Sequence, residues 1–209
     1  MRSGQFITFE GVEGVGKSTQ ARLLADRLKA TGQDVIVTRE PGGTPLAEKI
    51  RDLILEYRPK SPEAEFLLFS AARAEHLSVL IRPALEAGKS VICDRFIDST
   101  RVYQGEVFGV APSLIRTVEQ HIVAATMPVL TIILDLDPTV GLERAAERGT
   151  LSRYDEARIE VHRVLRQGFL NIASTEPSRC AVVDAARPAD AVAADVWAAV
   201  EARLATTAE

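Results

Sequence analysis

The sequence predicts an α/β fold in which a parallel sheet carries helices on both faces. Five short β-rich runs alternate with longer stretches of helical spacing, and these runs cover residues 5–10, 34–38, 90–94, 129–135 and 180–184. The runs are almost continuously apolar, as expected of strands that are buried on both sides. The chain has 209 residues, of which 46% are hydrophobic and 26% charged. That length and composition suit one domain with a sizeable core.

The ends of the expected helices carry residues that commonly start or stop a helix. Helical spacing covers residues 17–31, 62–88 and 188–204. Gly32 and Gly88 close the first two stretches, and Pro112, Pro138 and Pro188 stand where helices are expected to begin. Because no repeat, linker or low-complexity tract divides the chain, we predict a single domain over residues 1–209.

Composition and charge argue against several classes of function. The net charge of -4 and the pI near 5.5 oppose a nucleic-acid partner, which would need a basic surface. No apolar run approaches the roughly 20 residues that cross a bilayer, so we expect no membrane partner. The N-terminus lacks the apolar segment of a secretory signal, so a cytoplasmic protein is expected. Cys93 and Cys180 are too few for a disulfide framework, and no C-x-x-C motif or Cys/His cluster suggests a zinc site.

The stretch GVEGVGKS at residues 11–18 matches the phosphate-binding pattern G-x-x-x-x-G-K-[ST]. It lies between an expected strand and an expected helix, the context in which this pattern forms a P-loop. The glycines let backbone N–H groups turn toward a phosphate at a helix N-terminus, and the lysine adds positive charge. We therefore expect ATP to be bound by Gly11, Val12, Glu13, Gly14, Val15, Gly16, Lys17, Ser18 and Thr19.

The end of the strand at residues 90–94 offers the groups for a metal ion and for a second phosphate. The Ser18 hydroxyl can bind Mg2+, and the carboxylate of Asp94 can face that ion. Arg95 follows at the carboxyl end of the sheet, where ligands bind in open α/β folds. A strand-end salt bridge is the alternative interpretation of Arg95. The base-selecting tetrapeptide N-K-x-D of GTPases is absent from the sequence.

Phe69 and Arg73 lie four residues apart and share one face of an expected helix. The neighbouring turns of that helix offer Arg73 no carboxylate, so its partner is expected elsewhere in the fold. A flat aromatic ring beside a planar donor can stack on a nucleobase and hydrogen-bond to its edge. The alternative for Phe69 is a place in the hydrophobic core.

Five segments together resemble the bacterial thymidylate kinase (dTMP kinase) family. They occur in order over nearly the whole chain, as FITFEGVEGVGKSTQ, TREPGGT, LLFSAAR, DRFIDSTRVYQG and ERGTLSR. The resemblance implies a P-loop NTPase-type three-layer α/β/α fold with a five-stranded parallel sheet and a short lid. It also implies transfer of the ATP γ-phosphoryl group to dTMP, giving dTDP, with Mg2+ as cofactor, in a homodimer whose contact helices fall near residues 62–82 and 112–125.

The resemblance also assigns site residues. It implies that Phe69 stacks on thymine and Arg73 hydrogen-bonds to the base, which Thr100 and Gln104 also contact. Arg95 corresponds to the arginine that holds the dTMP phosphate, Tyr103 to the aromatic residue near the sugar 2′ position, and Glu13 to an acidic residue near the 3′-hydroxyl. Pro41 follows Glu40 in a bend that the family often makes with a cis peptide. Arg39 and Arg51 are further candidates for phosphate contact.

One position departs from part of the family. Some thymidylate kinases carry an arginine in the P-loop where this chain has Gly14, so the transferring phosphoryl group needs another cation. We expect a lid at residues 144–156, in which Gly149 ends the first helix. Arg148 and Arg153 are expected to be catalytic, and Arg144 is expected to lie toward the adenine. In this respect the chain resembles the lid-arginine subtype of the family. We also expect an arginine in place of Gly14 to restore part of the charge. The alternative is a solvated lid in which Arg144 pairs with Glu147.

The predicted chemistry needs no general base, because a dTMP phosphate oxygen is already an anion at neutral pH. We therefore expect a helix-surface or a packing role for each of the three histidines, His76, His121 and His162. Three alternatives remain: another nucleoside monophosphate or deoxynucleoside kinase, a non-catalytic nucleotide-binding module, and a nucleic-acid-dependent ATPase. The acidic charge disfavours the last of these.

Overall fold

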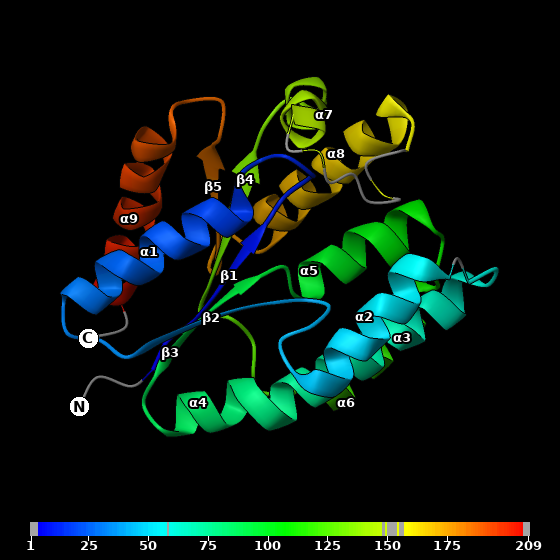
Figure 1. Ribbon diagram of the computed structural model, residues 1–209, viewed down its shortest axis with the longest axis horizontal. Helices are drawn as coiled ribbons and strands as arrows, with labels where there is room; N and C mark the ends of the chain where they lie inside the picture. The colour runs from blue at the N-terminus through cyan, green and yellow to red at the C-terminus, as the bar shows by residue number, and fades with distance from the viewer. Residues whose placement is uncertain (1–3, 58, 148, 150–153, 155–156, 207–209) are drawn as a thin grey trace.

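The structure is a computed structural model that describes residues 4–57, 59–147, 149, 154 and 157–206. Its centre is a five-stranded sheet in the order β2-β3-β1-β4-β5, in which every neighbouring pair is parallel (Figure 1). The strands are β1 Phe6–Glu10, β2 Val35–Arg39, β3 Ser90–Asp94, β4 Leu130–Asp135 and β5 Cys180–Asp184. Each lies within one residue of a run expected from the sequence, so the α/β fold class is confirmed.

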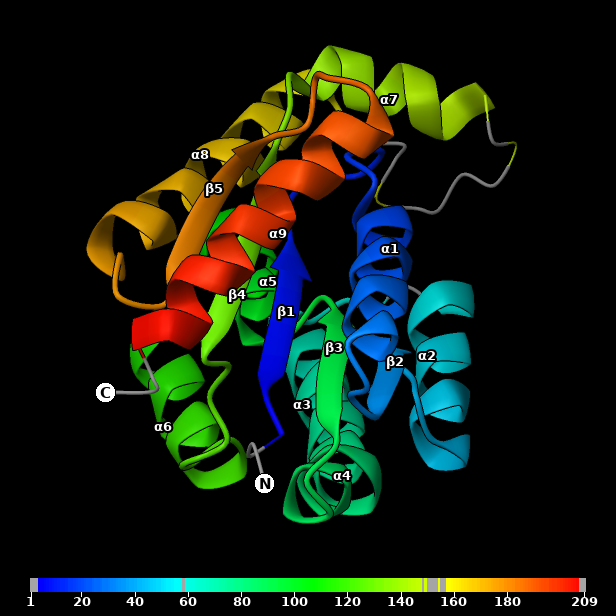
Figure 2. The same ribbon diagram turned by 90° about the vertical axis from the view of Figure 1, so that its left-hand side faces the viewer.

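Helices cover both faces of the sheet. They are α1 Lys17–Ala30, α2 Pro45–Glu56, α3 Pro62–His76, η1 Leu77–Ile81, α4 Arg82–Glu86, α5 Ile97–Thr100, η2 Arg101–Val107, α6 Pro112–Ile122, α7 Pro138–Glu147, α8 Ile159–Thr175 and α9 Ala189–Thr206. Helices α1 and α9 contact each other and pack on one face, while α8 and α4 pack on the other (Figures 1 and 2). The main core lies between these layers and includes Phe9, Ile132 and Phe169.

Strand order determines where the polar residues meet. The central strand β1 is buried throughout and pairs with β3 so that Phe9 stands beside Asp94. The carboxyl ends of these two strands therefore lie at the same edge of the sheet. The residues that follow them, the P-loop after β1 and Arg95 after β3, emerge side by side.

The helical stretch expected at residues 62–88 is divided into three consecutive segments, α3, η1 and α4. The middle segment, η1, is π-helical. Pro83 follows it and has no N–H to bond to the preceding turn, and its ring crowds the carbonyl of that turn. A wider turn before the proline relieves this conflict, which periodicity alone could not predict.

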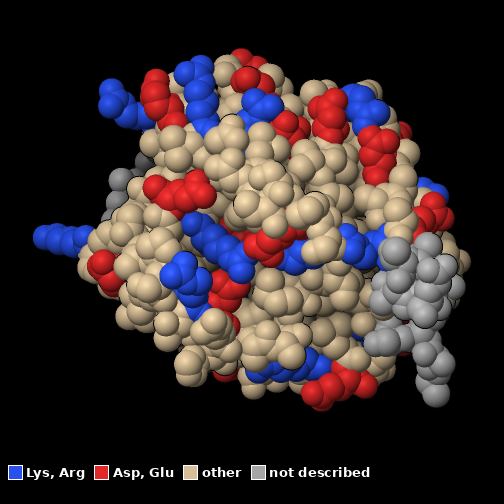
Figure 3. Space-filling model, turned by 180° about the vertical axis from the view of Figure 1, so that it is seen from behind, with Lys and Arg blue, Asp and Glu red and all other residues tan. Residues whose placement is uncertain are grey.

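The surface mixes charges of both signs. On the face shown in Figure 3, the described Lys and Arg side chains lie beside Asp and Glu side chains and form no extended area of one sign. Of the helices in the described part of the chain, none combines the length and the apolar character needed to span a bilayer.

Candidate active site

The loop between β1 and α1 has the backbone expected of a phosphate-binding loop. Gly11, Gly14 and Gly16 have φ angles of 133°, 75° and 94°, in the region that favours glycine. Gly16 caps α1, so the first N–H groups of the helix have no partner within it. Val12 and Val15 are buried and anchor the loop in the core. The arrangement is suited to bind an anion.

Lys17 is buried and folds back over the same loop. Its Nζ donates to the carbonyl oxygens of Gly11 at 3.0 Å and Val12 at 2.7 Å. Burial, and next the positive charge of Arg95, lower the pKa of Lys17 to about 8. A bound anion would restore the preference for the charged form.

Ser18 and Asp94 form a pair of oxygen donors. The Ser18 hydroxyl, in the first turn of α1, donates to Oδ2 of Asp94 at the end of β3. Mg2+ prefers oxygen ligands and keeps several waters, so two protein oxygens beside a phosphate site suit it. Among the described residues, no group of three or more His, Cys, Asp or Glu side chains could hold a metal ion by itself.

Arg95 occupies a constrained position between the P-loop and η2. Its φ of 69° is unusual for a residue with a side chain. Its guanidinium donates to Glu13 Oε1 at 3.0 Å, to the Gly11 carbonyl at 3.2 Å and to Ser99 Oγ at 3.0 Å, and it lies 5.1 Å from the centre of the Tyr103 ring. It is therefore more than a strand-end salt bridge.

Glu13 is the acidic centre of this group. Its Oε1 accepts from the Tyr103 hydroxyl at 2.5 Å, and its Oε2 lies 3.5 Å from Nδ1 of His162. Burial alone would raise the pKa of Glu13. Its interaction with His162 and the charges of Arg95 and Lys17 outweigh burial and hold this pKa well below its usual range. His162, expected only in a helix-surface or a packing role, thus lies against the site.

Phe69 and Arg73 extend the site along α3. Phe69 is half-buried and lines the cavity, whereas the core position on this face is taken by the neighbouring Phe66. Arg73 donates to Glu40 at 2.7 Å, to Thr100 Oγ1 at 3.0 Å and to the Phe96 carbonyl at 3.1 Å. Its carboxylate partner thus comes from outside the helix, as expected. The Glu40–Pro41 peptide bond is cis.

These groups surround one cavity of about 290 Å³. The predicted site residues that line it are Glu13, Gly14, Gly16, Lys17, Ser18, Pro41, Phe69, Arg73, Asp94, Arg95, Thr100, Tyr103 and Gln104, joined by Arg39 and Arg51. The predicted residues that do not line it are Gly11, Val12, Val15, Thr19 and Arg144. Arg148 and Arg153 lie outside the described residues.

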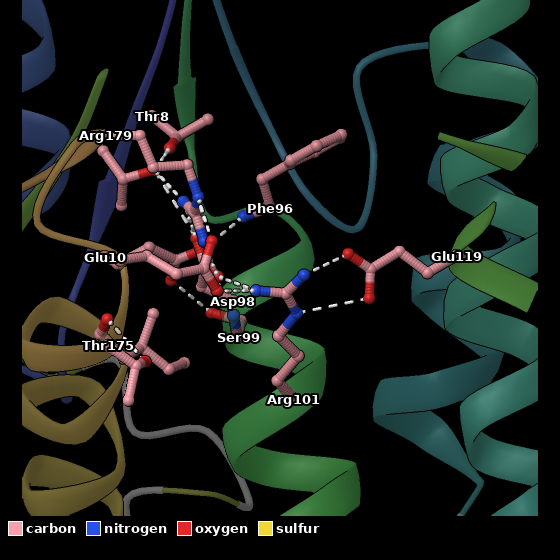
Figure 4. A network of polar contacts seen from close by, with 12 residues as sticks. Thr8, Glu10, Phe96, Asp98, Ser99, Arg101, Glu119, Thr175 and Arg179 are labelled. Carbon is pink, nitrogen blue, oxygen red and sulfur yellow. Dashed lines mark hydrogen bonds and ion pairs between the residues drawn. The ribbon is translucent and has the colours of Figure 1, made fainter. Parts of the chain in front are cut away.

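Several polar residues of the site were not predicted. Glu40 holds Arg73, and Glu10 accepts hydrogen bonds from the backbone N–H groups of Phe96 and Ser99 and from the Ser99 hydroxyl (Figure 4). Glu10 offered one indication in the sequence, because it is a charged residue at the end of an otherwise apolar strand. The contact between Glu40 and Arg73 joins segments that are distant in the sequence, so spacing could not reveal it.

Helix α7 approaches the P-loop closely. A Cβ added at Gly14 would lie 1.8 Å from the Gly141 carbonyl oxygen, so this backbone leaves no space for an arginine there. This geometry opposes the expectation that an arginine at position 14 restores charge, because the loop or α7 would have to move to admit it. Farther along α7, Arg144 donates to the Ala185 carbonyl at 3.0 Å, and Gly149, with φ 69°, follows the end of the helix.

Comparison with known proteins identifies the family of the chain. The thymidylate kinase family model matches residues 9–196. The thymidylate kinase of Caulobacter vibrioides is 52% identical over 206 residues, covering 98% of this chain and 99% of that protein. That of Deinococcus radiodurans is 48% identical over 204 residues, with 97% and 99% covered. The crystal structure of thymidylate kinase from Ehrlichia chaffeensis superposes with a TM-score of 0.79 at 36% identity, covering 95% and 99%.

Proposed function

The chain belongs to the thymidylate kinase family, and from this membership we propose that its cleft transfers the γ-phosphoryl group of ATP to dTMP, giving ADP and dTDP. The observation that carries the proposal is the single cavity lined both by the P-loop and by the Phe69–Arg73 face of α3. One end offers backbone N–H groups and a lysine for a polyphosphate. The other offers an aromatic ring and a planar donor for a base.

The donor half holds ATP. The P-loop N–H groups surround the phosphates, and Lys17 exchanges its bonds to the Gly11 and Val12 carbonyls for phosphate oxygens. Ser18 and Asp94 would hold Mg2+ at this site, and their direct contact supports this pairing. When bound, Mg2+ neutralises charge on the phosphate oxygens. Arg144 contacts the Ala185 carbonyl and does not line the cavity. We place it on the adenine side of the donor half.

The acceptor half holds dTMP. Phe69 stacks on the thymine, Arg73 donates to its edge, and Thr100 and Gln104 contact the base from α5 and η2. Pro41 helps to line this half. Arg95 holds the phosphate, and its fixed contacts with Glu13 and Gly11 support a preorganised position.

The sugar lies beside the joined pair of Glu13 and Tyr103. The low pKa of Glu13 keeps it a carboxylate near the 3′-hydroxyl, which can donate to it. The ring of Tyr103 is fixed by its own bond to Glu13 and occupies space near the 2′ position, which favours deoxyribose.

The reaction needs positioning and charge neutralisation rather than a base. The dTMP phosphate oxygen attacks the γ-phosphorus as an anion, and ADP leaves. Lys17 and Arg95 bring positive charge from the P-loop and from the end of β3. We propose that Arg148 and Arg153, in a lid over residues 144–156, supply the charge that an arginine at position 14 would otherwise give. A closed lid also keeps water from the γ-phosphoryl group.

We further propose that the protein acts as a homodimer in the cytoplasm. Leu67 on α3 and Val79 on η1 are 52% and 54% exposed, so each could be buried in a contact on this run of helix. Its nucleotide substrates are multiply charged and cross hydrocarbon only at a high cost, so an enzyme that uses them is expected where they are made.

A coupled ADP-release assay with Mg-ATP and each nucleoside monophosphate in turn tests the function. We expect dTMP to be the fastest acceptor. Lys17→Ala should abolish turnover while circular dichroism shows an intact fold, because Lys17 acts mainly on the transferring group. A wild-type protein that phosphorylates dCMP or AMP faster than dTMP would contradict the substrate, and one that binds nucleotides without releasing ADP would be a non-catalytic module.

A further inference from the structure

A buried polar cluster lies behind the base-binding half of the cleft, and the phosphoryl transfer itself does not use it. Its members are Thr38 on β2, Glu40 directly after β2, and Arg73 and His76 on α3. Their exposed fractions are 9%, 5%, 3% and 0%. Burying four polar side chains at one place costs free energy unless they are paired, so these side chains are expected to hydrogen-bond to one another.

The Glu40 carboxylate joins two residues that are one turn apart on α3. Its Oε2 accepts from Arg73 Nε at 2.7 Å, and its Oε1 accepts from His76 Nδ1 at 3.1 Å. On the far side of the imidazole, His76 Nε2 lies 2.7 Å from Thr38 Oγ1. A continuous chain of contacts therefore leads from β2 through His76 and Glu40 to Arg73.

The loop after β2 confines the imidazole. A Cβ added at Gly43 would lie 2.5 Å from His76 Nε2 and 2.5 Å from Thr38 Oγ1. The backbone thus approaches the ring so closely that only glycine fits there, and Gly43 has the positive φ of 85° that glycine tolerates. His76 has no space to move away from Glu40 in this direction.

These contacts determine how Arg73 presents its remaining donors. A guanidinium has five N–H groups. Nε donates to Glu40, Nη1 donates to Thr100, and Nη2 donates to the Phe96 carbonyl. Each terminal nitrogen has a second hydrogen, and Arg73 lines the cavity. Partners on three segments thus fix the plane in which these two hydrogens lie.

We propose that Glu40 and His76 are positioning residues for Arg73, and that the chain Thr38–His76–Glu40 sets how strongly the enzyme prefers dTMP to dCMP. The inference rests on the proposed role of Arg73 in reading the base. Thymine has a carbonyl where cytosine has an amino group. Arginine can only donate hydrogen bonds. A rigidly held guanidinium therefore pairs with the thymine carbonyl but faces the cytosine amino group with an unpaired donor. A loosely held guanidinium can turn away from cytosine, so it discriminates less between the two bases.

The test compares kcat/KM for dTMP with kcat/KM for dCMP in Glu40→Gln, His76→Gln and Thr38→Val. Glu40→Gln keeps the shape but loses the charge, and we expect the ratio to fall about tenfold, the effect of one charge-assisted hydrogen bond. His76→Gln should lower the ratio less, and Thr38→Val least. The KM for ATP should stay at its wild-type value. Glu86→Gln and His121→Gln, both at exposed positions, are the matched controls and should leave the ratio unchanged.

Arg73→Lys separates this inference from the proposed function. If it lowers the ratio while Glu40→Gln and His76→Gln keep the wild-type value, the positioning role is wrong and base reading by Arg73 stands. If Arg73→Lys also keeps the ratio, base reading by Arg73 is wrong and the inference falls with it. If the cluster variants have a lower melting temperature but keep the wild-type ratio of kcat/KM for dTMP to that for dCMP, the cluster has only a structural role. Should Glu40→Gln not fold, unchanged ratios in both His76→Gln and Thr38→Val overturn the inference.

Discussion

Glu10 occupies an unusual position for a carboxylate. It is fully buried at the end of the central strand, directly before the P-loop. It accepts hydrogen bonds from Phe96 N at 2.7 Å, Ser99 N at 3.2 Å and Ser99 Oγ at 2.6 Å (Figure 4). The Ser99 hydroxyl oxygen in turn accepts from Arg95. Glu10 therefore fixes the turn that carries the proposed phosphate-binding arginine.

The titration of Glu10 makes stability depend on pH in a defined direction. Burial, and next the negative charge of Asp98, raise the pKa of Glu10 from 4.5 to about 7. Between these values the folded protein keeps a proton that the unfolded chain has lost. The contribution of Glu10 to the free energy of unfolding is therefore fully present below about pH 4.5 and declines as the pH rises toward 7.

Glu10→Gln should remove this dependence. Urea denaturation at fixed ionic strength gives the free energy of unfolding of wild type and of Glu10→Gln. We expect the value of wild type minus that of the variant to fall as the pH rises from 5 to 7.5. Glu86→Gln, at an exposed position on α4, is the matched control. A difference between wild type and Glu10→Gln that stays constant over this range would show that Glu10 does not titrate there.

Individual residues divide into those that local sequence could identify and those that it could not. The P-loop, Asp94 and the Phe69–Arg73 pair follow from a motif, a strand end and a helical spacing, and each contributes residues to the same cavity. Glu40 and His162 do not follow from spacing, because each finds its partner only when distant segments pack together. Such buried polar contacts depend on the tertiary structure, which the sequence pattern does not describe.

At the scale of elements, patterns that repeat were predictable and local distortions were not. The five strands were found because each is a short apolar run; β1, β3 and β4 are buried almost throughout, whereas the edge strands β2 and β5 are partly exposed. The segment η2 carries Tyr103 and Gln104 into the site as a π-helix, and η1 widens the helix before Pro83. Both depend on a balance between backbone hydrogen bonds and side-chain packing that has no periodic signature.

The contact between the P-loop and α7 should be sensitive to a single methyl group. Gly14→Ala brings its Cβ against the Gly141 carbonyl, so either the loop or α7 must move. We expect a higher KM for ATP and a lower kcat in steady-state kinetics. Gly32→Ala is the control, since Gly32 also has a positive φ of 82° but no atom within 4 Å of an added Cβ. If both variants change KM and kcat equally, the lost activity comes from backbone strain and not from the contact between position 14 and Gly141.

The lid prediction concerns the segment that follows α7. If Arg148 and Arg153 stabilise the transition state, Arg148→Ala and Arg153→Ala should each lower kcat about a hundredfold with little change in the KM for dTMP. Loss of a surface ion pair would be far smaller. Gly14→Arg should not rescue Arg153→Ala, for want of space beside Gly141. Arg163→Ala, exposed on α8, is the control. Wild-type kcat in both lid variants would show that the charge comes from groups outside the lid, such as Lys17, Arg95 and Mg2+.

At the scale of the whole molecule, sheet topology explains why the site lies where it does. The chain crosses from β1 through β2 to β3, and β3 inserts between them in the sheet order. The ends of β1 and β3 thus become neighbours although α1, β2, α2, α3 and α4 separate them in sequence. The donor half of the cleft comes from the first crossing, the loop and helix after β1, and the acceptor half from α3 and the segments after β3.

The proposed dimer is the prediction that belongs to this scale. Leu67 and Val79 are more than half exposed on α3 and η1, and α3 also contacts α6. Exposed apolar side chains on the helices that the family resemblance assigns to the dimer contact can be buried there on self-association. Light scattering after gel filtration should give twice the chain mass of 22.7 kDa. Leu67→Glu places a charge on the surface and should shift the mass toward one chain, whereas Val182→Glu, at an exposed position on β5, should not. A wild-type mass of one chain at micromolar concentration would contradict the homodimer.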